Sequence, residues 1–328
     1  MALMTTWPIS LADIQDAGRR IRPYLSPTPA RQYAQLDRRV GGDIQVLVKH
    51  ENHNPTNSFK ARNAMAVLTS LTPEERSAGV VAATRGNHGQ AVAWAGRELG
   101  IPVTLCVPVG NNCEKNEAMC AFGARLVEQG TDYDDAVAVA DRLSRKAGLQ
   151  LVHSTNHPQI LAGAGTITLE MLEHEGELDA MVVSLGGGSQ AVGALTVARA
   201  LRPELEVYAI QSAAAPTMHD SWHDGKPTLR PAGPTIAEGL DTRDTYELTF
   251  GTLCEGLRDF LTVTDAEIAE AVRILLLTTH NLTEGAGATG LAGLCKLRDT
   301  LAGKKVGIVL SGANIEQQTL RRILQEEL

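Results

Sequence analysis

Short apolar segments alternate with helical segments along most of this 328-residue chain, and this alternation restricts the fold more than any other feature. The predicted strands are residues 44–48, 80–83, 103–107, 125–127, 151–152, 180–184, 206–210 and 306–310. The predicted helices are residues 11–21, 89–99, 116–122, 132–147, 160–174, 191–201, 265–279, 284–301 and 316–327, whereas residues 212–250 look irregular. Alternating β and α units predict parallel sheets with helices on both faces. We therefore expect an α/β fold, in two domains or one bilobed unit.

One lysine lies where a turn-forming stretch becomes a helix. The stretch reads Asn54-Pro55-Thr56-Asn57-Ser58-Phe59-Lys60-Ala61-Arg62-Asn63, and an apolar helical pattern follows it. The start of a helix is electropositive, which makes an ammonium group easier to deprotonate. A neutral lysine amine is a nucleophile toward carbonyl groups. A solvated lysine at a helix start is the alternative.

Three consecutive glycines follow the predicted strand at residues 180–184 and precede a helix. Backbone N–H groups of Gly186, Gly187 and Gly188 can turn toward an anion, and the helix start adds positive potential. We interpret the cluster, with Ser189, as a phosphate site. A tight strand–helix turn without a ligand and a dinucleotide site are the alternatives, but the spacing is not G-x-G-x-x-G.

Four motifs together resemble one family. They are Ser58-Phe59-Lys60-Ala61-Arg62, Thr84-Arg85-Gly86-Asn87-His88-Gly89-Gln90, Gly186-Gly187-Gly188-Ser189 and Ser311-Gly312-Ala313-Asn314. In this order they resemble pyridoxal-phosphate enzymes of fold type II, which are similar to tryptophan synthase β, and in particular the threonine/serine dehydratase and serine racemase family. The resemblance implies two open, mostly parallel twisted sheets with flanking helices. It also implies a small α/β domain at residues 54–155, and a large cofactor-binding domain made of residues 1–53 and 156–328.

The same resemblance implies the residues that hold the cofactor. Lys60 would be the catalytic residue and would hold pyridoxal phosphate as a Schiff base. The cofactor-binding set implied is Phe59, Lys60, Asn87, Gly186, Gly187, Gly188, Ser189, Gly239 and Ser311. Ser189 replaces the fourth glycine of the family's phosphate loop, but its hydroxyl can donate to a phosphate. Ser311 would face the pyridine nitrogen with a neutral hydroxyl, which favours prompt loss of a β leaving group.

Substrate-binding residues are implied in the same way. The set is Thr56, Thr84, Arg85, Gly86, His88 and Thr242. Arg85 stands where serine racemases carry a proton-donating serine. Because a guanidinium group is a poor proton donor, racemisation is disfavoured, and Arg85 is expected to bind an anionic group, either the α-carboxylate or a substrate side chain.

The resemblance implies β-elimination from a β-hydroxy-α-amino acid, which yields a 2-oxo acid and ammonia. Arg85 and the segment Asp241-Thr242-Arg243 leave room for a larger or acidic substrate, such as phenylserine or 3-hydroxyaspartate. Another reaction of the same fold, β-replacement or racemisation, is the alternative, and a nucleotide-binding protein without enzymatic activity is a more remote one.

The family's divalent-cation motif falls on residues 211–217, where both carboxylates are missing, so we expect no Mg²⁺ or Ca²⁺ there. The spacing of Cys113 and Cys120 fits no zinc template.

The net charge of −8 and the 4% aromatic content argue against nucleic-acid binding. The five scattered cysteines indicate reduced thiols in a cytoplasmic protein, and no apolar run is long enough for a membrane span. The resemblance implies that the protein forms a homodimer. It also implies that the site binds a small amino acid as substrate.

Overall fold

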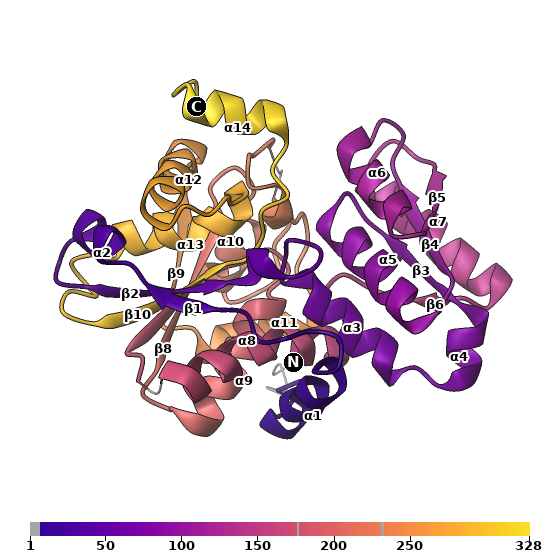
Figure 1. The fold of residues 1–328 in the computed structure, drawn as a ribbon, viewed down its shortest axis with the longest axis horizontal. Helices are drawn as coiled ribbons and strands as arrows, with labels where there is room; N and C mark the ends of the chain where they lie inside the picture. The colour runs from indigo at the N-terminus through magenta and orange to yellow at the C-terminus, as the bar shows by residue number, and fades with distance from the viewer. Residues whose placement is uncertain (1–6, 176, 231–232) are drawn as a thin grey trace.

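The computed structural model describes residues 7–175, 177–230 and 233–328, and its strands form two sheets (Figure 1). The six-stranded sheet has the order β1 (Ala30–Gln32), β2 (Gln45–His50), β10 (Lys305–Leu310), β7 (Ala180–Ser184), β8 (Glu206–Ser212) and β9 (Asp259–Val263). The four-stranded sheet has the order β5 (Arg125–Glu128), β4 (Val103–Val107), β3 (Val80–Ala83) and β6 (Gln150–Leu151). Every strand pair is parallel except β1 with β2. The predicted fold class, with two open and mostly parallel sheets, is confirmed.

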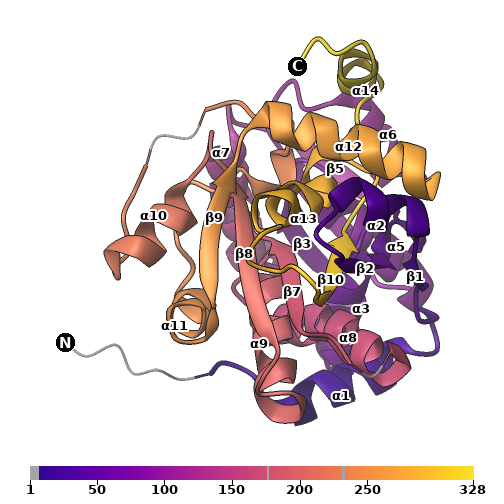
Figure 2. The ribbon, with the colours of Figure 1, turned by 90° about the vertical axis from the view of Figure 1, so that its left-hand side faces the viewer.

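Helices cover both faces of the six-stranded sheet. The helices below the sheet in Figure 1 are α1 (Leu11–Ile21), α8 (Pro158–Glu175), α9 (Ser189–Leu201) and α11 (Glu247–Gly256). Those above it are α2 (Ala34–Val40), α12 (Asp265–Thr279), α13 (Gly285–Lys296) and α14 (Gln317–Leu324). Figure 2 shows the same two helix layers from the side, with α10 (Thr217–Asp224) beside the edge strand β9. A parallel sheet buried on both faces explains why its strands read as continuous apolar runs.

The four-stranded sheet is also covered on both faces. Its helices are α4 (Pro73–Ala78), α5 (Asn87–Leu99), α6 (Cys113–Ala121) and α7 (Tyr133–Ala147). Along β3, Val80 and Ala82 belong to the main hydrophobic core, whereas Val81 and Ala83 pack in a separate cluster with α7. This alternation is what the two-residue side-chain period of a strand requires. Helix α3 (Lys60–Ser70) packs on both α5 and α8, so it links the two sheets through one continuous core.

The sequence interpretation missed several elements. The segment predicted to be irregular, residues 212–250, contains α10, the short 3₁₀ helix η2 (Glu238–Leu240) and the start of α11. Helix α10 carries His, Asp, Ser and Trp rather than a clear apolar stripe, and it ends at Gly225 with a left-handed φ of 66°. The strands β1 and β9 were also not predicted. Each lies at a sheet edge and pairs on one side only, so half-exposed polar residues are tolerated in it.

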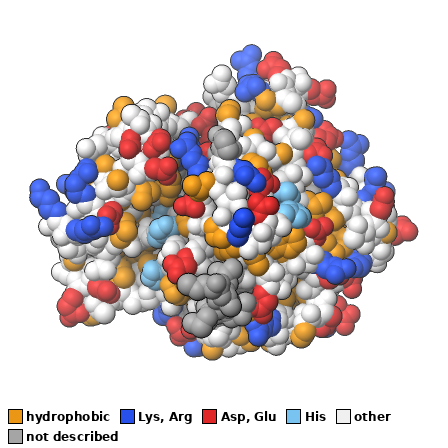
Figure 3. Space-filling view, turned by 180° about the vertical axis from the view of Figure 1, so that it is seen from behind, with side chains coloured by type: hydrophobic (Ala, Val, Ile, Leu, Met, Phe, Trp, Pro, Cys, Tyr) orange, Lys and Arg blue, Asp and Glu red, His pale blue; other side chains and the backbone are white. Residues whose placement is uncertain are grey.

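The surface has mixed charge on the face drawn in Figure 3. Blue Lys and Arg side chains lie among red Asp and Glu side chains over that face. In the part of the chain that the structure describes, no helix has both the length and the apolar character needed to cross a bilayer. Across the same residues, no group of three or more His, Cys, Asp or Glu side chains is arranged to hold a metal ion.

Candidate active site

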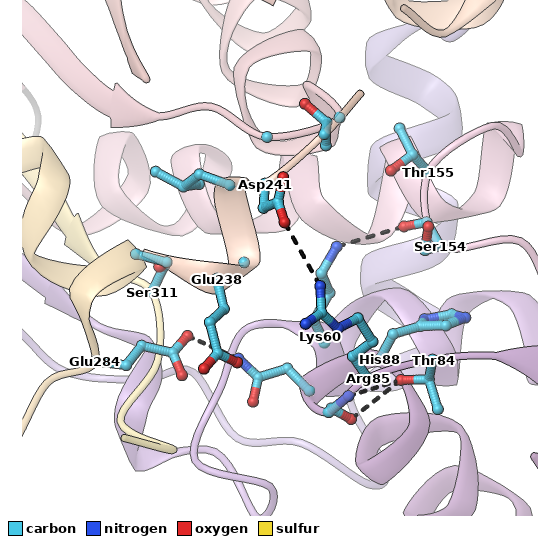
Figure 4. Close-up of a pocket in the computed structure, with 18 of the residues that line it drawn as sticks. Lys60, Thr84, Arg85, His88, Ser154, Thr155, Glu238, Asp241, Glu284 and Ser311 are labelled. Carbon is cyan, nitrogen blue, oxygen red and sulfur yellow. Dashed lines mark hydrogen bonds and ion pairs between the residues drawn. The ribbon is translucent and has the colours of Figure 1, made fainter. Parts of the chain in front are cut away.

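Lys60 is the first residue of α3, and the fold places its amine at the bottom of a cavity. The turn before it is fixed to the end of β10, because Phe59 N donates to the Ser311 carbonyl at 2.9 Å and Ser58 forms a bridge with Gly312. Lys60 Nζ lies 3.4 Å from the Ser154 carbonyl oxygen (Figure 4). Loss of hydration lowers the pKa of this amine to about 8, although the charge of Glu284 acts in the opposite direction. A substantial fraction of Lys60 is therefore neutral in mildly basic solution.

A buried network of charged groups holds the first turn of α3. Arg62 donates to both carboxylate oxygens of Glu51 at 2.7 and 2.9 Å, and to both of Glu170 at 2.7 and 2.8 Å. Lys49 donates to Glu170 at 2.7 Å. Bidentate guanidinium–carboxylate pairs fix orientation as well as distance. Arg62 of the lysine motif thus anchors the helix that begins with Lys60.

The segment Thr84–His88 comprises the loop after β3 and the first two residues of α5, and it lies beside Lys60 in Figure 4. The Thr84 hydroxyl accepts from Gly86 N at 3.0 Å and from Gly89 N at 2.9 Å, and so fixes the turn. A Cβ on Gly89 would lie 2.4 Å from both Thr84 Cγ2 and Met119 Sδ, so only glycine fits there. The N–H groups at the start of α5 have no partner within the helix and can bind an anion.

His88 is neutral in this loop. Its Nε2 lies 3.0 Å from the Val152 carbonyl, which can only accept, so Nε2 carries the proton. Burial, with the nearby Lys60 charge, lowers the pKa of His88 to about 3. The side-chain donor of His88 is therefore already used, and Nδ1 is a buried acceptor without a partner. Only the backbone of His88 remains to bind a carboxylate.

The glycine cluster forms a close turn between β7 and α9. Gly188 precedes the helix with a left-handed φ of 95°. A Cβ on Gly187 would lie 2.3 Å from Thr155 Oγ1, and a Cβ on Gly186 would lie 2.7 Å from the Gly239 carbonyl oxygen. The three glycines line the cavity with bare backbone, directly before the positive end of the dipole of α9, a 13-residue helix. This arrangement suits a phosphate group.

One cavity of about 260 Å³ brings nearly all of the predicted site residues together. Those that line it are Phe59, Lys60, Thr84, Arg85, Gly86, Asn87, His88, Gly186, Gly187, Gly188, Ser189, Gly239, Thr242 and Ser311. Thr56 does not line it. Thr56 lines a second cavity, of about 380 Å³, and its buried hydroxyl has no hydrogen-bond partner.

The structure adds residues to the site that the sequence interpretation did not select. Glu284, at the start of α13, accepts from Asn87 Nδ2 at 2.7 Å, and Asn314 Nδ2 donates to Asn87 Oδ1 at 2.7 Å. Burial raises the pKa of Glu284 to about 7. A signal was present, because Glu284-Gly285-Ala286-Gly287 places a carboxylate before a glycine-rich helix start. Lys115 also lines the cavity. It lies on the polar helix α6, where nothing in the neighbouring sequence indicates a functional lysine.

Comparison with known proteins agrees with the motifs. The family model described as "Pyridoxal-phosphate dependent enzyme" matches residues 21–312. The chain is 35% identical over 320 residues to an L-threonine ammonia-lyase of Thermotoga maritima, covering 98% of this chain and 79% of that one. It is 33% identical over 306 residues to an L-threo-3-hydroxyaspartate ammonia-lyase of Saccharomyces cerevisiae, covering 93% of each. The solved structure of maize serine racemase matches it with a TM-score of 0.91 and 28% identity, over 98% of both chains.

Proposed function

Because the chain belongs to the family of pyridoxal-phosphate-dependent enzymes, we propose that it removes water and then ammonia from a β-hydroxy-α-amino acid. The observation that carries this proposal is a single cavity holding a lysine amine of lowered pKa and a glycine turn at a helix start. The similarity to two ammonia-lyases supports the reaction type.

The residues around the cavity fit the cofactor. The bare turn of Gly186, Gly187 and Gly188 would hold its phosphate group, together with the start of α9. Lys60 would hold it covalently. Asn87, oriented from both ends by Glu284 and Asn314, would contact the ring, as would Ser311. When bound, pyridoxal phosphate supplies the electron sink that makes the Cα–H bond of an attached amino acid acidic.

The chain's own residues then bind the substrate and move protons. The turn at Thr84 and Gly86, with the first N–H groups of α5, would bind the α-carboxylate. Lys60 Nζ would take the Cα proton, because its neutral form is accessible and the Ser154 carbonyl orients it. Because His88 is neutral, it adds no positive charge to the region that would bind the carboxylate.

Substitution of Lys60 by alanine tests the proposal. We expect Lys60→Ala to lose the visible absorbance band of the lysine-bound cofactor and to form no 2-oxo acid from β-hydroxy-α-amino acids, since no other amine replaces its function. Lys146→Ala, at the exposed end of α7, is the matched control and keeps both. Normal turnover by Lys60→Ala would refute the assignment.

Racemisation is the second candidate, and the similarity to serine racemase favours it. Arg85 argues against it, because a guanidinium group neither gives nor takes a proton readily. Chiral analysis of serine or hydroxyaspartate after incubation distinguishes the two reactions, and added thiol would reveal β-replacement. Conversion to the opposite stereoisomer without 2-oxo acid would replace the dehydratase proposal.

We further propose that the protein is a cytoplasmic homodimer. The resemblance to the family supports the dimer, and five cysteines without disulfides support a reducing compartment. Light scattering on the purified protein measures the mass of the assembly and thereby tests the dimer.

A further inference from the structure

Besides Lys60, three cationic side chains line the cavity, and two of them each lie near two carboxylates rather than one. Lys115 and Arg243 each lie within 4 Å of two carboxylates that other elements supply. The pairs are Lys115 with Glu238 and Glu316, and Arg243 with Asp132 and Asp134. Only 13% of the Lys115 side chain is exposed. Two negative charges therefore compensate each of these cations, which lowers the attraction of either one for a further anion.

Arg85 differs from both. Among the residues that the structure describes, Arg85 forms an ion pair with Asp241 alone (Figure 4). The distance between Arg85 Nη1 and Asp241 Oδ2 is 3.5 Å, which is long for a charge-assisted hydrogen bond. Some 53% of the Arg85 side chain is exposed. A guanidinium group has five N–H donors, so most of its hydrogen-bonding capacity remains open.

Asp241 is also incompletely paired. Its side chain is only 18% exposed, and its Oδ1 is buried without a hydrogen-bond partner. The residue follows η2 in the segment 241–246, which has no regular secondary structure, so no helix or strand ladder fixes its backbone. A loose pair between two loops exchanges partners more readily than a bidentate pair would.

We propose that Arg85 binds the side-chain carboxylate of an acidic β-hydroxy-α-amino acid, and that Asp241 is an internal competitor that holds Arg85 until this carboxylate displaces it. The inference rests on the proposed function and specifies its substrate class. The α-carboxylate already has a place at the start of α5, so the second carboxylate is the group left for Arg85. Neutral substrates such as serine or threonine leave the Arg85–Asp241 pair intact and gain nothing from it.

Direct binding to the holoenzyme gives the first test, because it does not depend on turnover. Succinate has two carboxylates on four carbons and no amine, so it cannot react, and butyrate lacks the second carboxylate. We expect the wild-type protein to bind succinate more tightly than butyrate in calorimetry. Arg85→Gln should weaken succinate binding about 10- to 100-fold and leave butyrate unchanged. Asp241→Asn should tighten succinate binding about threefold or more, because the competing charge is gone.

Arg243→Gln is the matched control, since Arg243 is an equally exposed arginine of the same cavity. We expect it to keep the preference for succinate over butyrate. In turnover, the ratio of kcat/KM for 3-hydroxyaspartate to that for serine should fall about 10- to 100-fold in Arg85→Gln, with Arg85→Lys in between.

Three results would overturn the inference. Equal losses for succinate and butyrate in Arg85→Gln would place Arg85 on the α-carboxylate. Weaker succinate binding in Asp241→Asn would make Asp241 a direct ligand rather than a competitor. Serine turnover with no preference for dicarboxylates would reject the substrate class but keep the dehydratase. Succinate binding as expected, without turnover of any hydroxy amino acid, would reject the proposed reaction and keep the carboxylate site.

Discussion

Lys60, His88 and Glu284, which line the cavity, have pKa values far from those of the same groups in water. Burial lowers the pKa of Lys60 to about 8 and that of His88 to about 3, and it raises that of Glu284 to about 7. Each shift favours the neutral form. The cavity therefore holds less charge than its residues suggest, which suits a site that must accept a phosphate and a zwitterion.

Replacement of Glu284 should change how stability depends on pH. The folded protein keeps the Glu284 proton up to about pH 7, whereas in the unfolded chain the carboxyl group has its ordinary pKa, near 4.5, and releases the proton there. The free energy of unfolding therefore falls as the pH rises through this window, by at most about 3 kcal/mol. In Glu284→Gln this fall should disappear from urea unfolding of the cofactor-free protein between pH 4.5 and 8. Glu327→Gln, at an exposed position, should retain the wild-type profile, and equal profiles for both variants would contradict the assignment.

The sequence predicted a cavity residue well where the residue's neighbours in the chain also form its surroundings in the fold. Lys60 and the glycines stand out because turn residues, a strand and a helix start lie next to them in the chain. Lys115 reaches the cavity only through long-range packing, so its neighbours in sequence say little about it, whereas Glu284 had a local signal that was not used. Thr56 shows the opposite relation, because it lies near Lys60 in the sequence but the turn directs it to another cavity.

At the scale of secondary-structure elements, helix ends were predicted best where capping is local. Ser10 caps α1, and both of its capping-box hydrogen bonds with Asp13 are present. The predicted bounds of α1 and of α12 agree with the structure. The two edge strands of the larger sheet, β1 and β9, were not predicted, because they are defined by their single neighbour rather than by an apolar run.

Gly187 should be intolerant of any side chain. A Cβ there would overlap Thr155, so Gly187→Ala must shift the turn that precedes α9 and should destabilise the protein by about 1–3 kcal/mol. We also expect weaker binding of pyridoxal phosphate, measured by fluorescence titration of the cofactor-free variant. Gly251→Ala, within α11 and with open space around it, should instead be neutral or stabilising. Wild-type cofactor affinity in Gly187→Ala would show that the turn does not hold the phosphate.

For the whole molecule, ion pairs across the cavity join the parts built on the two sheets. Lys115, Arg85 and Asp132 come from the part with the four-stranded sheet. Their partners come from the part with the six-stranded sheet. Lys115 pairs with Glu238 and Glu316, Arg85 pairs with Asp241, and Asp132 pairs with Arg243. We propose that these parts are the small domain of residues 54–155 and the large domain of residues 1–53 and 156–328.

Lys115→Met should loosen this contact. Glu238 and Glu316 would then lie close together without a counter-charge, at a cost of about 1 kcal/mol. We expect faster amide hydrogen exchange in residues 236–246 and 312–316, and wild-type exchange in the Lys115→Arg and Lys146→Met controls. If exchange in these segments does not change, the two parts are held by apolar packing rather than by charge.

The position of β10 has a consequence for how the protein is made. This strand lies between β2 and β7, although β2 comes from near the start of the chain and β10 from near its end. During synthesis on the ribosome the centre of the larger sheet stays open until residues 305–310 have emerged, and its folding rests on contacts between distant residues. The turn before Lys60 is held by Ser311 and Gly312, directly after that strand. Lys60 can therefore reach its position in the cavity only after β10 has joined the sheet, and we expect cofactor binding to begin only once that strand is in place.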